Sequence, residues 1–251
     1  MRARFVTCVL AGAVLLASAP GHAQDAQAIL NKVASAYKNA KTYQAQASIN
    51  QTIQVGNQQQ RQSGTIITKY KAPNKLVTIV QGMQQNLHIY SDGKTLYIYS
   101  PKENQYMKGA APASFAQQQG IGAVGGGDPT QIGLQLQSMF GTGAKKLPDR
   151  KVGGKPAFVI QSSKSGSSPD GQGTFQMTAT ALIDKASYLL KQLTLNGTRT
   201  SGTQKVVQNV TIVFASQQIN PNLPDSAFVF KPPAGAKELQ RQGAPGAPSP
   251  R

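Results

Sequence analysis

The chain has 251 residues and a formal net charge of +17, because Asp and Glu are scarce. One cysteine and two histidines exclude a disulfide framework and a zinc-finger module within the chain. A hydrophobic content of 39% indicates a folded protein, and the length fits one large all-β domain or two small domains. The charge suggests an acidic partner, either nucleic acid or a membrane surface.

The N-terminus has the layout of a secretory signal peptide. Arg2 and Arg4 precede an uncharged apolar run over residues 5–17, and small residues follow it. This run is shorter than the roughly 20 residues that a membrane-spanning helix needs. We predict cleavage after Ala23, so that residues 1–23 are removed. Cys8 lies inside the apolar run and not at its end, so lipidation is not expected. The mature protein is therefore predicted to be periplasmic, which argues against nucleic acid as a partner.

The first half of the mature chain reads as a helix followed by strands. Asp25 is a candidate N-cap for a helix over residues 25–41, whose apolar residues recur at three- and four-residue steps. From Tyr43 onward the period changes to two, and Asp92-Gly93 is a strong hairpin signal. The strands predicted in this half cover residues 43–53, 65–70, 75–80, 87–90, 95–99 and 105–107, and the polar run 58–62 is predicted as a connection.

A stretch rich in Gly, Ala and Gln over residues 109–127 is predicted as a flexible loop. Its G-x-G-x-x-G pattern lacks the strand and helix that a dinucleotide site requires. Asp128 and Pro129 then provide an N-cap and a first helical residue for a helix over residues 129–140.

The second half of the chain is again predicted to be strands, and residues 162–173 to be a polar loop. The strands cover residues 157–161, 175–183, 188–195 and 206–214, and the tail 240–251 reads as disordered. About ten short strands with regular turn signals predict one domain over residues 24–239, mainly β with α: a single antiparallel sheet curled into an incomplete (half) barrel. The N-terminal and central helices would cover its concave face. They are short for so wide a sheet, so an apolar cavity could remain.

Residues suited to catalysis or metal binding are few. His88 stands alone in a strand, and Asp92, Asp184 and Asp225 all fall at predicted turns, where a turn role explains them. We therefore expect no enzymatic activity, no metal site and no cofactor; a hydrolase of unknown type is the weaker alternative.

Most basic residues are dispersed, and one segment clusters them. This basic patch consists of Lys145, Lys146, Arg150, Lys151 and Lys155. A solvated face is the simplest interpretation, and the alternative is docking to a membrane surface or to an acidic envelope protein.

Three segments, taken in order along the chain, match patterns of a known family. Residues 70–76 and 90–101 are similar to the "R-P-x-x-F-R … S-D-G-K-T-L-W-x-Y-D-P" run of the outer-membrane lipoprotein carrier (LolA/LolB-like) superfamily, which the chain resembles. Residues 182–193 are similar to a strand-turn-strand pattern of that superfamily, and residues 220–233 to its closing "F-x-F-x-P-P-x-G". The chain differs in having Lys75 where the superfamily has Arg, and Tyr97 and Leu182 where it has Trp.

This resemblance implies a half-barrel closed by helices, with an apolar cavity that accepts lipid or acyl chains, and a role in carrying or sensing lipidated proteins. We therefore predict a monomeric, non-enzymatic periplasmic protein that binds a lipid or an acylated lipoprotein, with the role of a carrier. The alternative is an envelope-stress sensor or assembly factor that acts through the basic patch. The candidate cavity residues, taken from one face of each strand and from the second helix, are Ile49, Ile53, Ile66, Tyr70, Leu96, Ile98, Phe140, Phe175, Met177 and Phe214.

Overall fold

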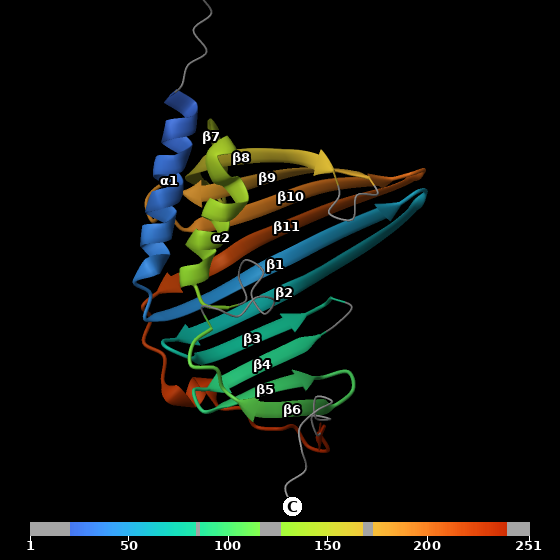
Figure 1. The fold of residues 1–251 in the computed structure, drawn as a ribbon. Helices are drawn as coiled ribbons and strands as arrows, with labels where there is room; N and C mark the ends of the chain where they lie inside the picture. The colour runs from blue at the N-terminus through green and yellow to red at the C-terminus, as the bar shows by residue number, and fades with distance from the viewer. Residues whose placement is uncertain (1–20, 84–85, 116–126, 168–172, 240–251) are drawn as a thin grey trace, which may run out of the picture.

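The computed structural model describes residues 21–83, 86–115, 127–167 and 173–239, which form one sheet with two α-helices (Figure 1). The helices are α1 (Gly21–Lys38) and α2 (Thr130–Phe140), with short 3-10 turns η1 (Gly141–Gly143) and η2 (Asp225–Phe228). The strands of the first half are β1 (Thr42–Val55), β2 (Gln58–Lys71), β3 (Lys75–Gln81), β4 (Leu87–Asp92), β5 (Thr95–Ser100) and β6 (Gln105–Ala110). Those of the second half are β7 (Lys145–Val152), β8 (Lys155–Ser167), β9 (Thr174–Asp184), β10 (Leu190–Ser201), β11 (Gln204–Ile219) and β12 (Lys237–Glu238).

The sheet consists of two meanders joined at its centre. Its strand order is β12-β6-β5-β4-β3-β2-β1-β11-β10-β9-β8-β7, so the first strand pairs with the last long strand. That central pair runs antiparallel from Tyr43 opposite Ile219 to Val55 opposite Val206. Every other neighbouring pair is antiparallel except β12 with β6, which is parallel. The sheet is therefore not purely antiparallel as predicted, because the short strand β12 runs parallel to β6.

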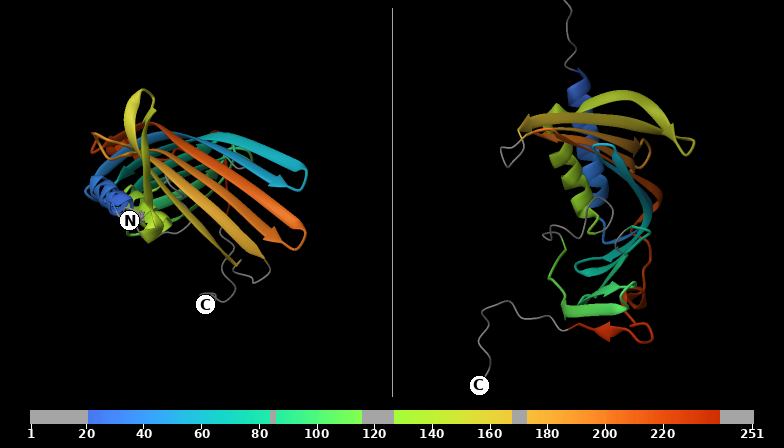
Figure 2. Two further views of the ribbon diagram at one scale, coloured as in Figure 1. Left: turned by 90° about the horizontal axis from the view of Figure 1, so that it is seen from above. Right: turned by 90° about the vertical axis from the view of Figure 1, so that its right-hand side faces the viewer.

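The sheet curls but does not close, which confirms the predicted half-barrel. Strands β7 and β12 end the strand order among the described residues, and no pairing joins them. Both helices lie against the inner face near one end of the long strands, and the hairpins β1–β2 and β10–β11 extend well beyond them (Figures 1 and 2). A part of the inner face is thus covered by helices and a part is not.

Helix α1 packs one apolar stripe onto the sheet, as its sequence period predicts. Ala26, Leu30, Val33 and Tyr37 are fully buried, and they recur at three- and four-residue steps. The helix begins at Gly21, so Asp25 lies in its second turn. The prediction that Asp25 caps the helix is therefore wrong, because the helical hydrogen bonds continue upstream of it.

Helix α2 begins one residue later than predicted, at Thr130, and Pro129 takes the cap position instead of the first helical position. The Asp128 carboxylate accepts hydrogen bonds from the backbone N–H of Thr130 at 2.9 Å and from its hydroxyl at 2.8 Å. Gly133 lies directly against α1, since a Cβ atom at this position would be 2.4 Å from the Cα of Ala34. A glycine is therefore needed for the two helices to pack this closely.

Three polar stretches form more strand than predicted. The run 58–62 belongs to β2, β8 continues through residues 162–167 of the predicted loop, and the basic segment 145–152 is strand β7. These stretches are largely exposed on both faces. Backbone pairing in a ladder needs no apolar alternation, so the sequence pattern gave no signal for them. The expected loop 109–127 contributes residues 109–110 to β6, and most of its remainder lies outside the described residues. The tail 240–251 also lies outside the described residues.

The C-terminal segment covers the outer face of β3–β6. Phe228 is fully buried against Val77, and the Phe230 ring lies 5.1 Å from the rings of both Tyr90 and Tyr97. Asp225 forms ion pairs of 2.7 Å with Lys71 and Lys75. This segment thus buries the outer face of one half of the sheet, opposite the helices.

Candidate functional site: the inner face of the sheet

The candidate cavity residues of the strands share one face of the sheet. Residues directly opposite in a ladder point to the same side. Ile49 pairs with Ile212, and Ile66 pairs with Ala47, both of which are in the core beneath the helices. The pairings across the rest of the ladder place the other strand candidates on this inner face, namely Ile53, Tyr70, Leu96, Ile98, Phe175, Met177 and Phe214.

Four of the ten candidates belong to the packed core and do not line an open space. Ile66 is 8% exposed, Tyr70 3%, Phe214 2% and Phe140 0%, and all but Ile66 are members of the main core cluster. That cluster joins Tyr70, Phe140 and Phe214 to buried residues of both helices, such as Leu30 of α1 and Leu136 of α2. Their contribution is to stability, through apolar surface removed from water.

The other six candidates are only partly buried, and Ile49 and Leu96 among them pack against the main core cluster: Ile49, Ile53, Leu96, Ile98, Phe175 and Met177. The structure brings Leu96 and Ile98 together in a hollow of about 230 Å³. Met107, which is 40% exposed, completes the apolar side of this hollow, and Gly109 and Pro112 also line it. Met107 is a lining residue that was not predicted, although its alternation with Tyr106 along β6 is a signal that could have identified it.

The polar groups beneath α1 form a closed hydrogen-bond network. The hydroxyls of Tyr37 and Tyr43 donate to the side-chain oxygen of Gln217 at 2.7 and 3.0 Å. The backbone N–H of Leu190 donates to the Tyr37 hydroxyl at 3.1 Å. Burial raises the pKa of both phenols well above the ordinary value, so they stay neutral. These groups hold α1 on the sheet.

A second buried contact links the sheet to the start of α2. The Tyr70 hydroxyl donates to the Asp128 carboxylate at 3.3 Å. Burial raises the pKa of Tyr70, and the negative charge of Asp128 raises it further. The same carboxylate accepts the hydrogen bond from the backbone N–H of Thr130, so one acidic group contacts both the start of α2 and strand β2.

The acidic residues at predicted turns have structural roles. Asp92 accepts hydrogen bonds of 2.8 Å from the backbone N–H groups of Lys94 and Thr95, and the latter bond lowers its pKa. Asp184 accepts in the same way from Ala186 and Ser187. In the described ranges no three His, Cys, Asp or Glu residues come close enough to hold a metal ion.

His88 lies on the outer face, away from the inner surface. Its ring is 5.7 Å from that of Tyr99 and 6.5 Å from that of Tyr90. Burial lowers the pKa of its imidazole. His88 is thus one of the aromatic side chains on the outer face, next to Tyr90 and Tyr99.

The basic patch occupies an edge of the sheet. Its residues lie on β7 and at the start of β8, with alternate side chains on opposite faces. Lys146 lies 3.6 Å from Asp149, which also pairs with Lys185; Lys145, Arg150, Lys151 and Lys155 are exposed. Docking of an acidic partner or membrane here stays a prediction. Among the described helices, none is both long and apolar enough to cross a membrane.

The fold and this face define a class of protein: an open half-barrel whose apolar inner face is covered by helices at one end only. The chain belongs to the family described as "predicted periplasmic protein (DUF2092)", whose model matches residues 26–118 and 188–240. No curated protein matches the sequence.

Similar solved structures are distant in sequence. One is a putative outer membrane lipoprotein-sorting protein domain from Vibrio parahaemolyticus, at 9% identity and a TM-score of 0.31, covering 82% of this chain and 97% of that one. The LolA superfamily protein NE2245 from Nitrosomonas europaea has 9% identity and a TM-score of 0.29 over the same shares. LprF from Mycobacterium bovis has 12% identity and a TM-score of 0.38, covering 81% and 97%.

Proposed function

We propose that this protein binds a lipid or an acylated lipoprotein on the uncovered part of its inner face, as a non-enzymatic periplasmic carrier. The observation that carries the proposal is the hollow lined by Leu96, Ile98 and Met107, on the same sheet face whose helix-covered part is the protein's core. Exposed apolar surface of this kind is typical of a site for a ligand or partner.

The chemistry of the face suits an alkyl chain. Leu96, Ile98 and Met107 form the apolar side of the hollow. Ile53, Phe175 and Met177 add apolar side chains elsewhere on the inner face, where they pair with the polar residues Gln208, Arg199 and Lys164. Each methylene group removed from water contributes about 0.8 kcal/mol. Several such groups give useful affinity without a charged contact or a catalytic side chain.

The family description supports a periplasmic location, and the predicted signal peptide agrees with it. In that compartment a carrier shields acyl chains from water. The uncovered end of the inner face would supply this shielding while the helix-covered end keeps the sheet folded.

The proposal is tested by ligand displacement and by mass spectrometry of lipid that co-purifies with the protein. We expect wild-type protein to bind a fluorescent fatty acid, and the double variant Ile98→Thr with Met107→Gln to bind it about tenfold more weakly, since apolar contact area is lost.

The matched control is Val229→Gln. Val229 is 49% exposed and lies on the C-terminal segment, outside the inner-face hollow, so this variant should bind like wild type. Absence of co-purifying lipid together with equal binding by all three proteins would overturn the proposal.

A further inference from the structure

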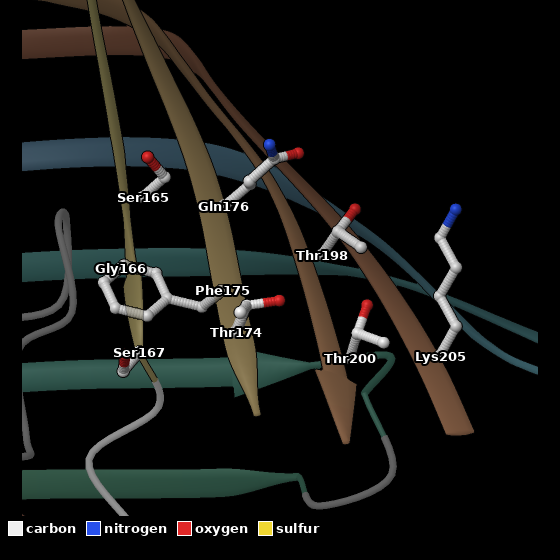
Figure 3. Close-up of a pocket in the computed structure, with 9 residues that line it drawn as sticks. All are labelled: Ser165, Gly166, Ser167, Thr174, Phe175, Gln176, Thr198, Thr200 and Lys205. Carbon is white, nitrogen blue, oxygen red and sulfur yellow. The ribbon is translucent and has the colours of Figure 1, made fainter. Parts of the chain in front are cut away.

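A second hollow, of about 600 Å³, lies at the far end of strands β8–β11 (Figure 3). This polar hollow is lined by Ser165, Gly166, Ser167, Thr174, Phe175, Gln176, Thr198, Thr200 and Lys205. Its volume falls within the range of roughly 300–1,000 Å³ that is usual for small-molecule sites. It differs from the inner-face site in its chemistry, because polar side chains dominate it.

The polar lining consists of two cross-strand rows on the outer face of the sheet. In the first row Ser165 pairs with Gln176, which pairs with Thr198. In the second row Ser167 pairs with Thr174, Thr174 with Thr200, and Thr200 with Lys205. The buried Ala179 and Ala181 mark the inner face of β9, and Thr174 and Gln176 alternate with that face. The polar hollow is therefore on the side of the sheet opposite the proposed lipid site.

The rows have the dimensions of an extended ligand. Neighbouring strands are about 4.8 Å apart, so the second row spans about 14 Å from Ser167 on β8 to Lys205 on β11. The two rows are two residues apart along each strand, which is about 7 Å. This area accommodates more than one sugar ring.

The side chains that line the polar hollow match the chemistry of a saccharide. A serine or threonine hydroxyl donates one hydrogen bond and accepts others, and the Gln176 amide does both, which is what a ligand rich in hydroxyls requires. Lys205 ends the second row with a positive charge, and no carboxylate is among the described lining residues. A single cation complements a single negative charge, as on a sugar carboxylate; a phosphate monoester carries about −1.5 to −2.

We propose that the polar hollow binds a carboxylate-bearing oligosaccharide, with its hydroxyls on the two rows and its carboxylate at Lys205. This site is distinct from the inner-face hollow, because its polar rows lie on the opposite face of the sheet and the two hollows share no described lining residue. The inner-face residue Phe175 also lines the polar hollow.

The test is a titration of ¹⁵N-labelled full-length protein with trigalacturonic acid and with the neutral maltotriose, followed by NMR. We expect trigalacturonic acid to shift amide signals of residues in the two rows and to bind more tightly than maltotriose. Lys205→Gln should weaken trigalacturonic acid about tenfold, which is the usual scale of a lost charge-assisted hydrogen bond, and leave maltotriose within twofold.

Two matched controls separate the site from general attraction to a basic protein. Lys102→Gln removes the same charge from an exposed turn and should change binding less than twofold. Thr198→Val with Thr200→Val should weaken both saccharides, whereas Thr211→Val, on the same face outside the hollow, should weaken neither. No shift in the two rows at millimolar saccharide, or equal losses in Lys205→Gln and Lys102→Gln, would overturn the proposal.

Discussion

The inner face of the sheet has two regions built from the same alternation but covered differently. Ile212 on β11 lies beneath the helices and is 4% exposed, whereas Ile53 on the neighbouring β1 lies on the same face beyond them and is only partly buried. Side-chain chemistry does not distinguish these positions. The layer above them does, so an identical residue is core in one region and available surface in the other.

The comparison is tested most strongly by removing one phenylalanine from each region. Phe140→Ala should lower the free energy of unfolding by about 3–5 kcal/mol, because its ring is fully buried between α2 and the sheet. Phe175→Ala, on a partly exposed ring beyond the helices, should cost about 1 kcal/mol or less. Urea unfolding measures both. Equal losses would show that the uncovered region is as tightly packed as the core.

A second substitution tests the two helices that cover the inner face. Gly133→Val should destabilise the protein by about 1–3 kcal/mol or more, because the new Cβ would collide with the Ala34 backbone and force α2 from α1. Gly109→Ala is the control, since a Cβ there meets nothing within 4 Å. Thermal unfolding monitored by circular dichroism compares them. A Gly133→Val protein as stable as wild type would mean that this close approach does not fix the cover.

Substitutions in the hydrogen-bond network beneath α1 should lower stability by a smaller amount. Tyr37→Phe leaves the Leu190 N–H buried without its acceptor and should cost about 1–3 kcal/mol. Tyr43→Phe leaves Gln217 with its bond from Tyr37 and should cost only about 0.5–1.5 kcal/mol. Urea unfolding midpoints show which variant is destabilised more. A larger loss in Tyr43→Phe would mean that Tyr43 contributes more to stability than Tyr37.

The smallest expected effect on stability concerns Asp225, in the C-terminal segment that covers the outer face of β3–β6. The ammonium groups of Lys71 and Lys75 lower the pKa of Asp225 to about 2, from 3.8. This ion pair therefore adds stability above about pH 4 and loses it as the pH falls from about 4 to about 2. Because Asp225 is exposed, the contribution is modest and declines with salt.

The measurement for this prediction is the urea midpoint against pH in low salt. Wild type and Asp225→Asn should differ near neutral pH and converge near pH 2. A difference that persists below pH 2 would rule out the ion pairs as its source.

The sequence predicted the fold class and most of the strands because an antiparallel sheet with one packed face leaves a period of two. The same period assigned strand candidates such as Ile49 and Met177 to one face. It could not tell that Ile66 and Phe214 are core, because that depends on what packs above them. Phe214 belongs to the cluster that contains the helix residues, and the close packing of the two helices depends on Gly133 against Ala34. Strand β7 was missed since it is largely exposed and carries no alternation. The role of the candidates in ligand binding stays a prediction.

The pairing of β1 with β11 has a consequence for how the sheet can assemble. Each meander is built from hairpins between consecutive strands, which need only short loops to close. The central ladder unites segments from nearly opposite ends of the chain, and such distant pairing slows folding. A truncation that removes residues 204–219 would therefore not trim an edge. It would divide the molecule in two and leave β1 and β10 as unprotected edges open to intermolecular pairing.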